Sequence, residues 1–240
     1  RIRKMKRLVD LMLVILPFEE QLYQEAGVPV HFVGHPLLDQ IPDQLLQETV
    51  RQTNLIGLLP GSREGEVRRI LPVMRDAALL LRKSLPAIEL FLPLSPNVPR
   101  SLVEEILGNI EVNIVPSPAY ELRHQAGFAL TASGTATLEN ALLGLPMAII
   151  YKLMPLTYLI GRLLVQVDRI GLVNIVAQED VVPEFIQSRA RPEDISRYVL
   201  EYLQNPSHQK TVLGALQKVQ KSLGEPGASE RAAGLVLGKE

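Results

Sequence analysis

Two stretches of the sequence follow one plan: TASGTATLENALLGLP at 131–146 and LIGLLPGSREGEV at 55–67. Each begins with a short apolar strand, passes through a turn of small polar residues and glycine, and then enters a helix. Two such units in one α/β domain bring two helix N-termini to the same edge of the sheet. That edge binds phosphorylated ligands in folds of this class, because helix N-termini present backbone N–H groups and a positive dipole end.

Strands and helices alternate along the chain on both sides of these stretches. From Leu55 onward the repeated β-α order predicts an α/β fold, with a parallel sheet, right-handed crossovers and helices on both faces. The predicted strands are 11–16, 30–33, 55–59, 88–94, 111–115, 128–131 and 147–151. The predicted helices are 18–26, 37–51, 66–84, 100–107, 119–125, 135–143, 155–167, 183–188, 192–204 and 207–223.

Composition narrows the functional classes. The 240 residues are 47% hydrophobic and 5% aromatic, which suits a buried parallel sheet. A net charge of -1 offers no basic field for nucleic acid. The absence of cysteine excludes disulfides, thiolate metal sites and a cysteine nucleophile, and the 4 histidines lack paired-ligand spacing. We therefore expect no metal and no nucleic-acid partner.

The beginning of the sequence resembles the interior of a longer chain. A basic stretch, RIRKMKR, precedes an apolar run at 8–18 that Asp10 interrupts, and no small-residue cleavage site follows it. No run approaches the ~18 apolar residues that span a bilayer. We expect a piece of a longer protein, with a boundary at the GHP of 34–36. Residues 1–36 would end a missing N-terminal domain, 37–223 would form a complete α/β domain, and 224–240 would be a flexible tail.

The first candidate site is PGSR. Gly61 lets the backbone approach a ligand, Ser62 offers N–H and hydroxyl donors, and the Arg63 guanidinium suits phosphate oxygens. A diphosphate would meet backbone donors and a cation here. An ordinary strand-to-helix turn with a surface arginine is an equally good interpretation of these residues alone.

The second candidate site is SGTATLE. Ser133 is the expected N-cap, and the N–H groups of Gly134 and Thr135 would open the helix toward an anion. Glu139, one turn later, could accept hydrogen bonds from two vicinal hydroxyls, as on a ribose. The plainer interpretation is a capped helix with a solvated glutamate, and the stretch matches neither the Walker pattern nor GxGxxG.

Three further features have both a functional and a structural interpretation. Asn174 lies in an apolar run and needs hydrogen-bond partners, either from a ligand or by anchoring its loop. The apolar, partly basic stretch 152–172 is either a core helix or a membrane-surface element. His35 either faces an interdomain cleft or packs. DxD and GxSxG motifs are absent, so neither a DxD-held metal nor a serine nucleophile is supported.

In combination, six stretches resemble the lipid-A-disaccharide synthase family of GT-B glycosyltransferases, in order from about residue 8 to about residue 200. They are LPFE (16–19), FVGHPLLD (32–39), LLPGSREGEV (58–67), TASGTATLE (131–139), PMAIIYKLMPLTYLIGRLL (146–164) and LVNIVAQEDVVPEFIQ (172–187). The resemblance implies a GT-B fold, in which two Rossmann-like domains face each other across a cleft. This chain would supply the C-terminal, donor-binding domain and the end of the N-terminal one.

The resemblance also implies an inverting transfer, without metal or cofactor, of 2,3-diacylglucosamine from its UDP donor to 2,3-diacylglucosamine 1-phosphate. The product is a β-1,6 disaccharide, the lipid A precursor. Carried over by position, the donor site comprises Gly61, Ser62 and Arg63 at the diphosphate, Ser133, Gly134 and Thr135 at the helix end, Glu139 at the ribose, and Asn174. Arg63 would also stabilise the leaving group, whereas the general base would lie in the missing domain. The chain alone is therefore expected to be inactive.

The same resemblance places the enzyme in the cytoplasm, peripheral to the inner membrane surface. A homodimeric partner or the absent domain would cover its exposed sheet. Two alternatives stay open at this point: an enzyme similar to UDP-N-acetylglucosamine 2-epimerase, which also holds UDP between two such domains, and a non-catalytic nucleotide-binding module.

Overall fold

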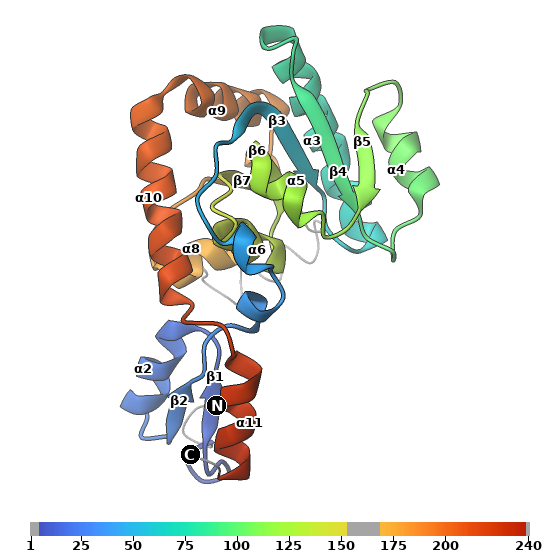
Figure 1. Ribbon diagram of the computed structural model, residues 1–240. Coiled ribbons are helices and arrows are strands. Elements are labelled where there is room, and N and C mark those ends of the chain that lie inside the picture. Colours follow the sequence, from blue (N-terminus) through green and yellow to red (C-terminus); the bar gives the residue numbers. More distant parts are fainter. Residues whose placement is uncertain (1–4, 153–168, 239–240) are drawn as a thin grey trace.

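The computed structural model describes residues 5–152 and 169–238 (Figure 1). The helix predicted at 155–167 lies outside these residues. Within them, the main sheet has six parallel strands in the order β5-β4-β3-β6-β7-β8. The strands are β3 (Gln52–Leu59), β4 (Glu89–Leu94), β5 (Asn113–Pro116), β6 (Ala126–Ala132), β7 (Met147–Tyr151) and β8 (Glu184–Ile186). All residues of β6 are buried, as expected for a central strand covered on both faces.

Helices cover both faces of this sheet. They are α3 (Glu64–Ser84), α4 (Arg100–Leu107), α5 (Tyr120–Gln125), α6 (Thr135–Leu142), α8 (Leu172–Ala177), α9 (Pro192–Gln204) and α10 (Pro206–Ser222). The chain runs outward from β3 to β5 and then returns to run from β6 to β8. Right-handed crossovers therefore place α3 and α4 on one face and α5 and α6 on the other. The predicted α/β fold is confirmed, and its strand order reverses between β3 and β6.

The first residues form a separate, smaller unit. Strands β1 (Met12–Val14) and β2 (Val30–Phe32) pair in parallel around helix α2 (Pro17–Glu25). Beside them lies α11 (Ala228–Leu237), which returns from the other end of the chain (Figure 1). The expected flexible tail at 224–240 is thus corrected, because most of it is this helix. The proposed boundary at 34–36 stays a prediction.

Arg231 is the main polar link between α11 and the first residues. Its Nε donates to the carbonyl of Val33 at 2.9 Å, and its Nη2 donates to the carbonyl of Glu225 at 2.6 Å. Nearby, the Gly227 N–H donates to Asp39 Oδ1. The segment 224–240 is rich in glycine and small residues, so its sequence gave no indication of this long-range contact.

Two predicted helices are wrong. The segment 37–51 contains only the 3₁₀ turns η1 (Pro36–Asp39) and η2 (Asp43–Leu45). Pro42 stands between them, where proline lacks the N–H that a continuous helix needs. The segment 183–188 supplies the edge strand β8, which pairs with β7, followed by the turn η3 (Gln187–Arg189). Pairing with an existing strand satisfied backbone groups that a short local helix would also have used.

No helix within 5–152 and 169–238 combines the length and apolar character required to cross a bilayer.

Candidate functional site

The two strand–turn–helix units end side by side. Leu59, the last residue of β3, pairs with Thr131 near the end of β6. The turns that follow therefore leave the same edge of the sheet from neighbouring strands. The strand order reverses between these two parallel strands, which makes their carboxyl ends a topological switch point. Ligands of open α/β sheets bind in the crevice outside such a point.

The turn after β3 requires glycine at its centre. Gly61 has φ +107, and a Cβ there would lie 2.6 Å from Glu66 Oε2. The next residue, Ser62, accepts a hydrogen bond through its carbonyl from Ser95 Oγ at 3.4 Å, which ties the turn to the end of β4. The backbone of this turn is therefore held in a shape that would strain any residue with a Cβ.

Arg63 is the N-cap residue of α3 and is directed toward solvent. Its side chain is 81% exposed, and its Nη1 lies 3.1 Å from Glu66 Oε1. An exposed pair of this kind contributes about 0–1 kcal/mol. A diphosphate, which offers charge-assisted bidentate hydrogen bonds, could replace Glu66 as the partner of the guanidinium.

The turn after β6 differs from the prediction in one respect. Gly134, not Ser133, is the N-cap of α6, and Thr137 returns hydrogen bonds to the Gly134 carbonyl from its N–H at 3.0 Å and its Oγ1 at 2.8 Å. Ser133 Oγ instead donates to the carbonyl of Ile170 at 2.9 Å. Gly134 has φ +148, and within residues 5–152 and 169–238 no atom lies within 4 Å of where its Cβ would be. These residues therefore leave the backbone uncovered where Thr135 begins the helix.

Glu139 is not a solvated residue. Its side chain is 17% exposed and forms an ion pair with Arg123, whose side chain is 2% exposed, at 2.8 Å from Oε2 to Nη1. Its Oε1 accepts a hydrogen bond from the Tyr120 hydroxyl at 3.3 Å. Burial, followed by the nearby carboxylate, raises the pKa of Tyr120 to about 12. Sequence reasoning missed Arg123 and Tyr120, which stand in no motif; the proximity of an arginine to a predicted carboxylate becomes visible only when α5 packs beside α6.

Asn174 is fully buried on α8. Its Nδ2 donates to the Val182 carbonyl at 2.8 Å and to Glu184 Oε1 at 2.9 Å, and its Oδ1 accepts from the Val182 N–H at 3.1 Å. These bonds are those of the loop-anchoring interpretation. The direct ligand contact implied by the resemblance would need a side chain that reaches the surface.

Glu184 completes this anchor and was also missed. Its Oε2 accepts from the Ile170 N–H and its Oε1 from the Gly171 N–H, both at 2.9 Å. Because Ile170 also accepts from Ser133, one series of hydrogen bonds joins the β6–α6 turn to the start of α8 and to β8. The predicted site residues Ser133 and Asn174 therefore belong to one hydrogen-bond network, which supports the β6–α6 turn.

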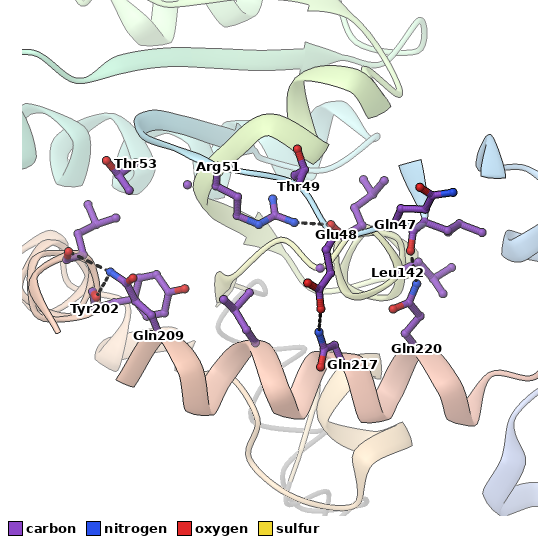
Figure 2. A pocket seen from close by; sticks show the side chains of 16 residues that line it. Gln47, Glu48, Thr49, Arg51, Thr53, Leu142, Tyr202, Gln209, Gln217 and Gln220 are labelled. Carbon is purple, nitrogen blue, oxygen red and sulfur yellow. Dashed lines mark hydrogen bonds between the residues drawn. The ribbon is translucent and has the colours of Figure 1, made fainter. Parts of the chain in front are cut away.

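A pocket of about 340 Å³ lies at the other edge of the sheet, next to Thr53 and Gly127, the second residues of β3 and β6 (Figure 2). Its Arg51 donates to the carbonyls of His124 at 2.7 Å, Ala126 at 3.0 Å and Leu143. Burial lowers the pKa of this guanidinium to about 10. The pocket is distant from the switch point, and Arg51 serves to hold three backbone segments together.

His35 packs, as the plainer interpretation expected. It is 7% exposed, and its Nδ1 accepts from the Leu37 N–H at 3.2 Å. Across the described residues, no group of three or more His, Asp or Glu side chains could hold a metal ion.

Solved structures with the same architecture define the class as GT-B-type α/β proteins. A UDP-GlcNAc 2-epimerase from Neisseria meningitidis, bound to UDP-GlcNAc, matches with a TM-score of 0.61 at 14% identity, over 98% of this chain and 63% of that one. The glycosyltransferase of kitacinnamycin matches with a TM-score of 0.59 at 18% identity, over 97% of this chain and 55% of that one. At these identities the likeness establishes the fold alone.

Sequence comparison establishes the family. The family model described as lipid-A-disaccharide synthetase matches residues 1–236, and the chain belongs to the lipid-A-disaccharide synthase family. The lipid-A-disaccharide synthase of Syntrophus aciditrophicus is 44% identical over 247 residues, and that of Geobacter metallireducens is 43% identical over 246. Each alignment covers 99% of this chain, which spans 64% of the length of either relative.

Proposed function

We propose that this chain is the donor-binding part of a glycosyltransferase that transfers 2,3-diacylglucosamine from its UDP donor to 2,3-diacylglucosamine 1-phosphate. The product would be the β-1,6 lipid A disaccharide, formed with inversion and without a metal. The observation that carries the proposal is the pairing of Leu59 with Thr131, which brings the PGSR and SGT turns together at the switch point of a chain from this family.

The diphosphate would lie between the two turns. Gly61 and Ser62 would supply backbone donors from one side, and the start of α6 at Gly134 and Thr135 would supply them from the other. Arg63 would exchange its exposed bond to Glu66 for the phosphate oxygens. As UDP departs, negative charge grows on the diphosphate, and one well-placed donor is worth about 2.7–4 kcal/mol in such a step.

The ribose would contact Glu139, whose carboxylate stands one turn along α6 from the diphosphate donors. We assign Asn174 and Ser133 an indirect part, because both already hold the segment 170–184 beside the β6–α6 turn. The ribose and the diphosphate would therefore be bound by successive turns at the start of the same short helix.

The acceptor site and the general base are proposed to lie in the part of the relatives that this chain does not span. In that arrangement residues 1–36 end the N-terminal domain, and residues 37–223 form the donor domain. We further propose a cytoplasmic enzyme, peripheral to the inner membrane, whose exposed sheet is covered by the absent domain or by a homodimeric partner. Sedimentation with anionic phospholipid vesicles tests the proposed membrane association. It would be refuted if the whole protein did not sediment with the vesicles.

Calorimetric titration with UDP tests the donor site directly. We expect the 240-residue chain to bind UDP, and Arg63→Ala and Glu139→Ala each to weaken binding by about tenfold, equivalent to ~1.4 kcal/mol. Matched controls are Arg68→Ala on the same helix and Glu104→Ala on α4, both from exposed pairs, which should change nothing.

Absence of UDP binding, or equal effects of site and control variants, would contradict the assignment. The reaction itself needs the upstream coding sequence restored, followed by an assay for the disaccharide from both substrates. Conversion of UDP-N-acetylglucosamine to its 2-epimer in that assay would instead favour an epimerase.

A further inference from the structure

We propose that Arg123 and Tyr120 of α5 are positioning residues that hold Glu139 in the orientation required to receive a ribose. This inference rests on the proposed function, since it concerns the same donor site. It assigns two residues from a segment without any motif, and it makes the selectivity for a ribose depend on the packing of α5 against α6.

Arg123 is held more firmly than a surface arginine. Its Nε and Nη2 donate to Asn140 Oδ1 at 3.0 and 2.7 Å, and its Nη2 also lies 3.2 Å from the Ala136 carbonyl. The remaining nitrogen, Nη1, faces Glu139 Oε2 at 2.8 Å. A planar fork with this many partners leaves the guanidinium little freedom. Arg123 therefore gives one carboxylate oxygen of Glu139 a fixed partner.

Tyr120 fixes the second oxygen. Its hydroxyl donates to Glu139 Oε1 at 3.3 Å, while its ring stacks near the guanidinium, with Arg123 Cζ 5.4 Å from the ring centroid. Two donors on two different oxygens determine the plane of the carboxylate, whereas one donor would leave it free to rotate. Both donors come from a helix that also contacts β3 and β6, so the orientation is tied to the sheet.

The hydrogen-bonding capacity of Glu139 leaves room for a ligand. A carboxylate offers about four lone-pair sites, two on each oxygen. Arg123 occupies one on Oε2 and Tyr120 one on Oε1. One acceptor direction remains on each oxygen, which is the number that two vicinal hydroxyls require. The side chain is 17% exposed, so part of it is accessible to a ligand from solvent.

A carboxylate whose orientation is already set loses less conformational freedom when a ligand binds. The diphosphate contacts do not share this dependence, since they come from the turns at 60–63 and 133–135. Removal of either positioning residue should therefore reduce discrimination between ribose and deoxyribose and leave diphosphate recognition intact. If these residues had a merely structural role, their removal would lower the stability of the fold without changing the ratio of the affinities for ribose and deoxyribose ligands.

The test compares the affinities of the 240-residue chain for UDP and 2′-deoxy-UDP, with inorganic pyrophosphate as competitor. We expect wild type to prefer UDP by about tenfold, a typical consequence of one lost hydrogen bond to a charged group. Glu139→Gln, Tyr120→Phe and Arg123→Lys should each reduce the preference to about threefold or less, with the same inhibition by pyrophosphate.

The controls are matched in kind. Tyr198→Phe removes a half-buried hydroxyl that bonds His208 at 3.3 Å, and Arg75→Lys alters a partly buried arginine of α3. Both should retain the wild-type preference. If Arg123→Lys fails to fold, as judged by circular dichroism, Tyr120→Phe decides alone.

The outcomes separate the two proposals. A wild-type chain that does not bind UDP, or binds 2′-deoxy-UDP equally well, refutes the ribose role of Glu139 and the inference with it. A wild type that discriminates, together with a Tyr120→Phe variant that discriminates equally, overturns the positioning role and leaves the proposed donor site standing.

Discussion

At the scale of single residues, His35 joins two distant parts of the chain through its backbone and holds its own turn through its ring. Its N–H donates to the Leu223 carbonyl at 2.9 Å, and its Nδ1 accepts from the Leu37 N–H. An imidazole that accepts at Nδ1 cannot carry a proton there. Burial lowers the pKa of His35 below its ordinary value of 6.5. The native state therefore favours the neutral ring.

This residue should make stability depend on pH. The unfolded chain takes up a proton at His35 near pH 6.5, whereas the folded chain resists it until a lower pH. The unfolded state thus binds more protons in this window, so stability falls as the pH drops below 6.5 and is retained above it. In urea unfolding at several pH values, His35→Asn, which keeps an acceptor but cannot titrate, should show a smaller decline.

His31→Asn is the control, because His31 is exposed on β2. The stability of this variant should decline with falling pH as much as that of the wild type. An unchanged decline in His35→Asn would show that another group causes the acid sensitivity.

At the scale of elements, the segment from Ile170 to Glu184 is held by side chains rather than by a long helix. Asn174 fastens α8 to the backbone at Val182, and Glu184 closes the start of α8 against β8. Ser133 joins the same segment to the β6–α6 turn. The shape of the proposed site thus depends on polar bonds between elements that are neighbours only in the folded chain.

Asn174→Ala should destabilise the protein by about 2–4 kcal/mol, because it leaves the buried Val182 N–H without a partner and removes one donor from the Glu184 carboxylate, which keeps those of Ile170 and Gly171. Thermal and urea unfolding would measure the loss. Asn205→Ala, which removes the N-cap of α10, is the matched control and should cost about 1 kcal/mol. At a temperature well below its unfolding midpoint, Asn174→Ala should lose less affinity for UDP than Arg63→Ala does. A larger affinity loss with normal stability would indicate a direct ligand contact instead.

At the scale of the whole molecule, the two ends of the chain meet. Helix α11 lies beside β1 and β2, and Arg231 holds it to the backbone at Val33 and Glu225 (Figure 1). Among the residues that the structure describes, the smaller unit also carries most of the large exposed apolar side chains, including Leu8, Leu22 and Val236. Its stability therefore depends on the returning helix more than on a core of its own.

Arg231→Met should release this unit selectively. Loss of the Arg231 bonds should accelerate amide hydrogen exchange in β1, β2 and α11 by at least about tenfold, corresponding to ~1.4 kcal/mol of local stability. The strands β3 and β6 should keep their protection. Arg197→Met, an exposed arginine of α9, is the control and should leave every region unchanged. Faster exchange throughout the main sheet would mean that the two units unfold together.

Local patterns were sufficient for the α/β class, for most strands and helices, and for the position of the two turns. Alternating apolar strands, amphipathic helices and glycine turns are determined by neighbours within a few residues, so they can be read before folding. The family also followed from the sequence, since its motifs occur in order along most of the chain.

Contacts between distant residues required the tertiary structure. Within the predicted helix 183–188, Glu184–Ile186 became a strand because β7 offered a free edge, and Ser133 lost its expected capping role because Ile170 came within reach. Arg123 met Glu139, and α11 returned to Val33, across intervals that no local pattern spans. The sequence by itself therefore determined which turns could meet a diphosphate. Only the packing of distant segments decided which side chains hold those turns and the carboxylate in place, because a buried polar group takes whichever partner the fold brings to it.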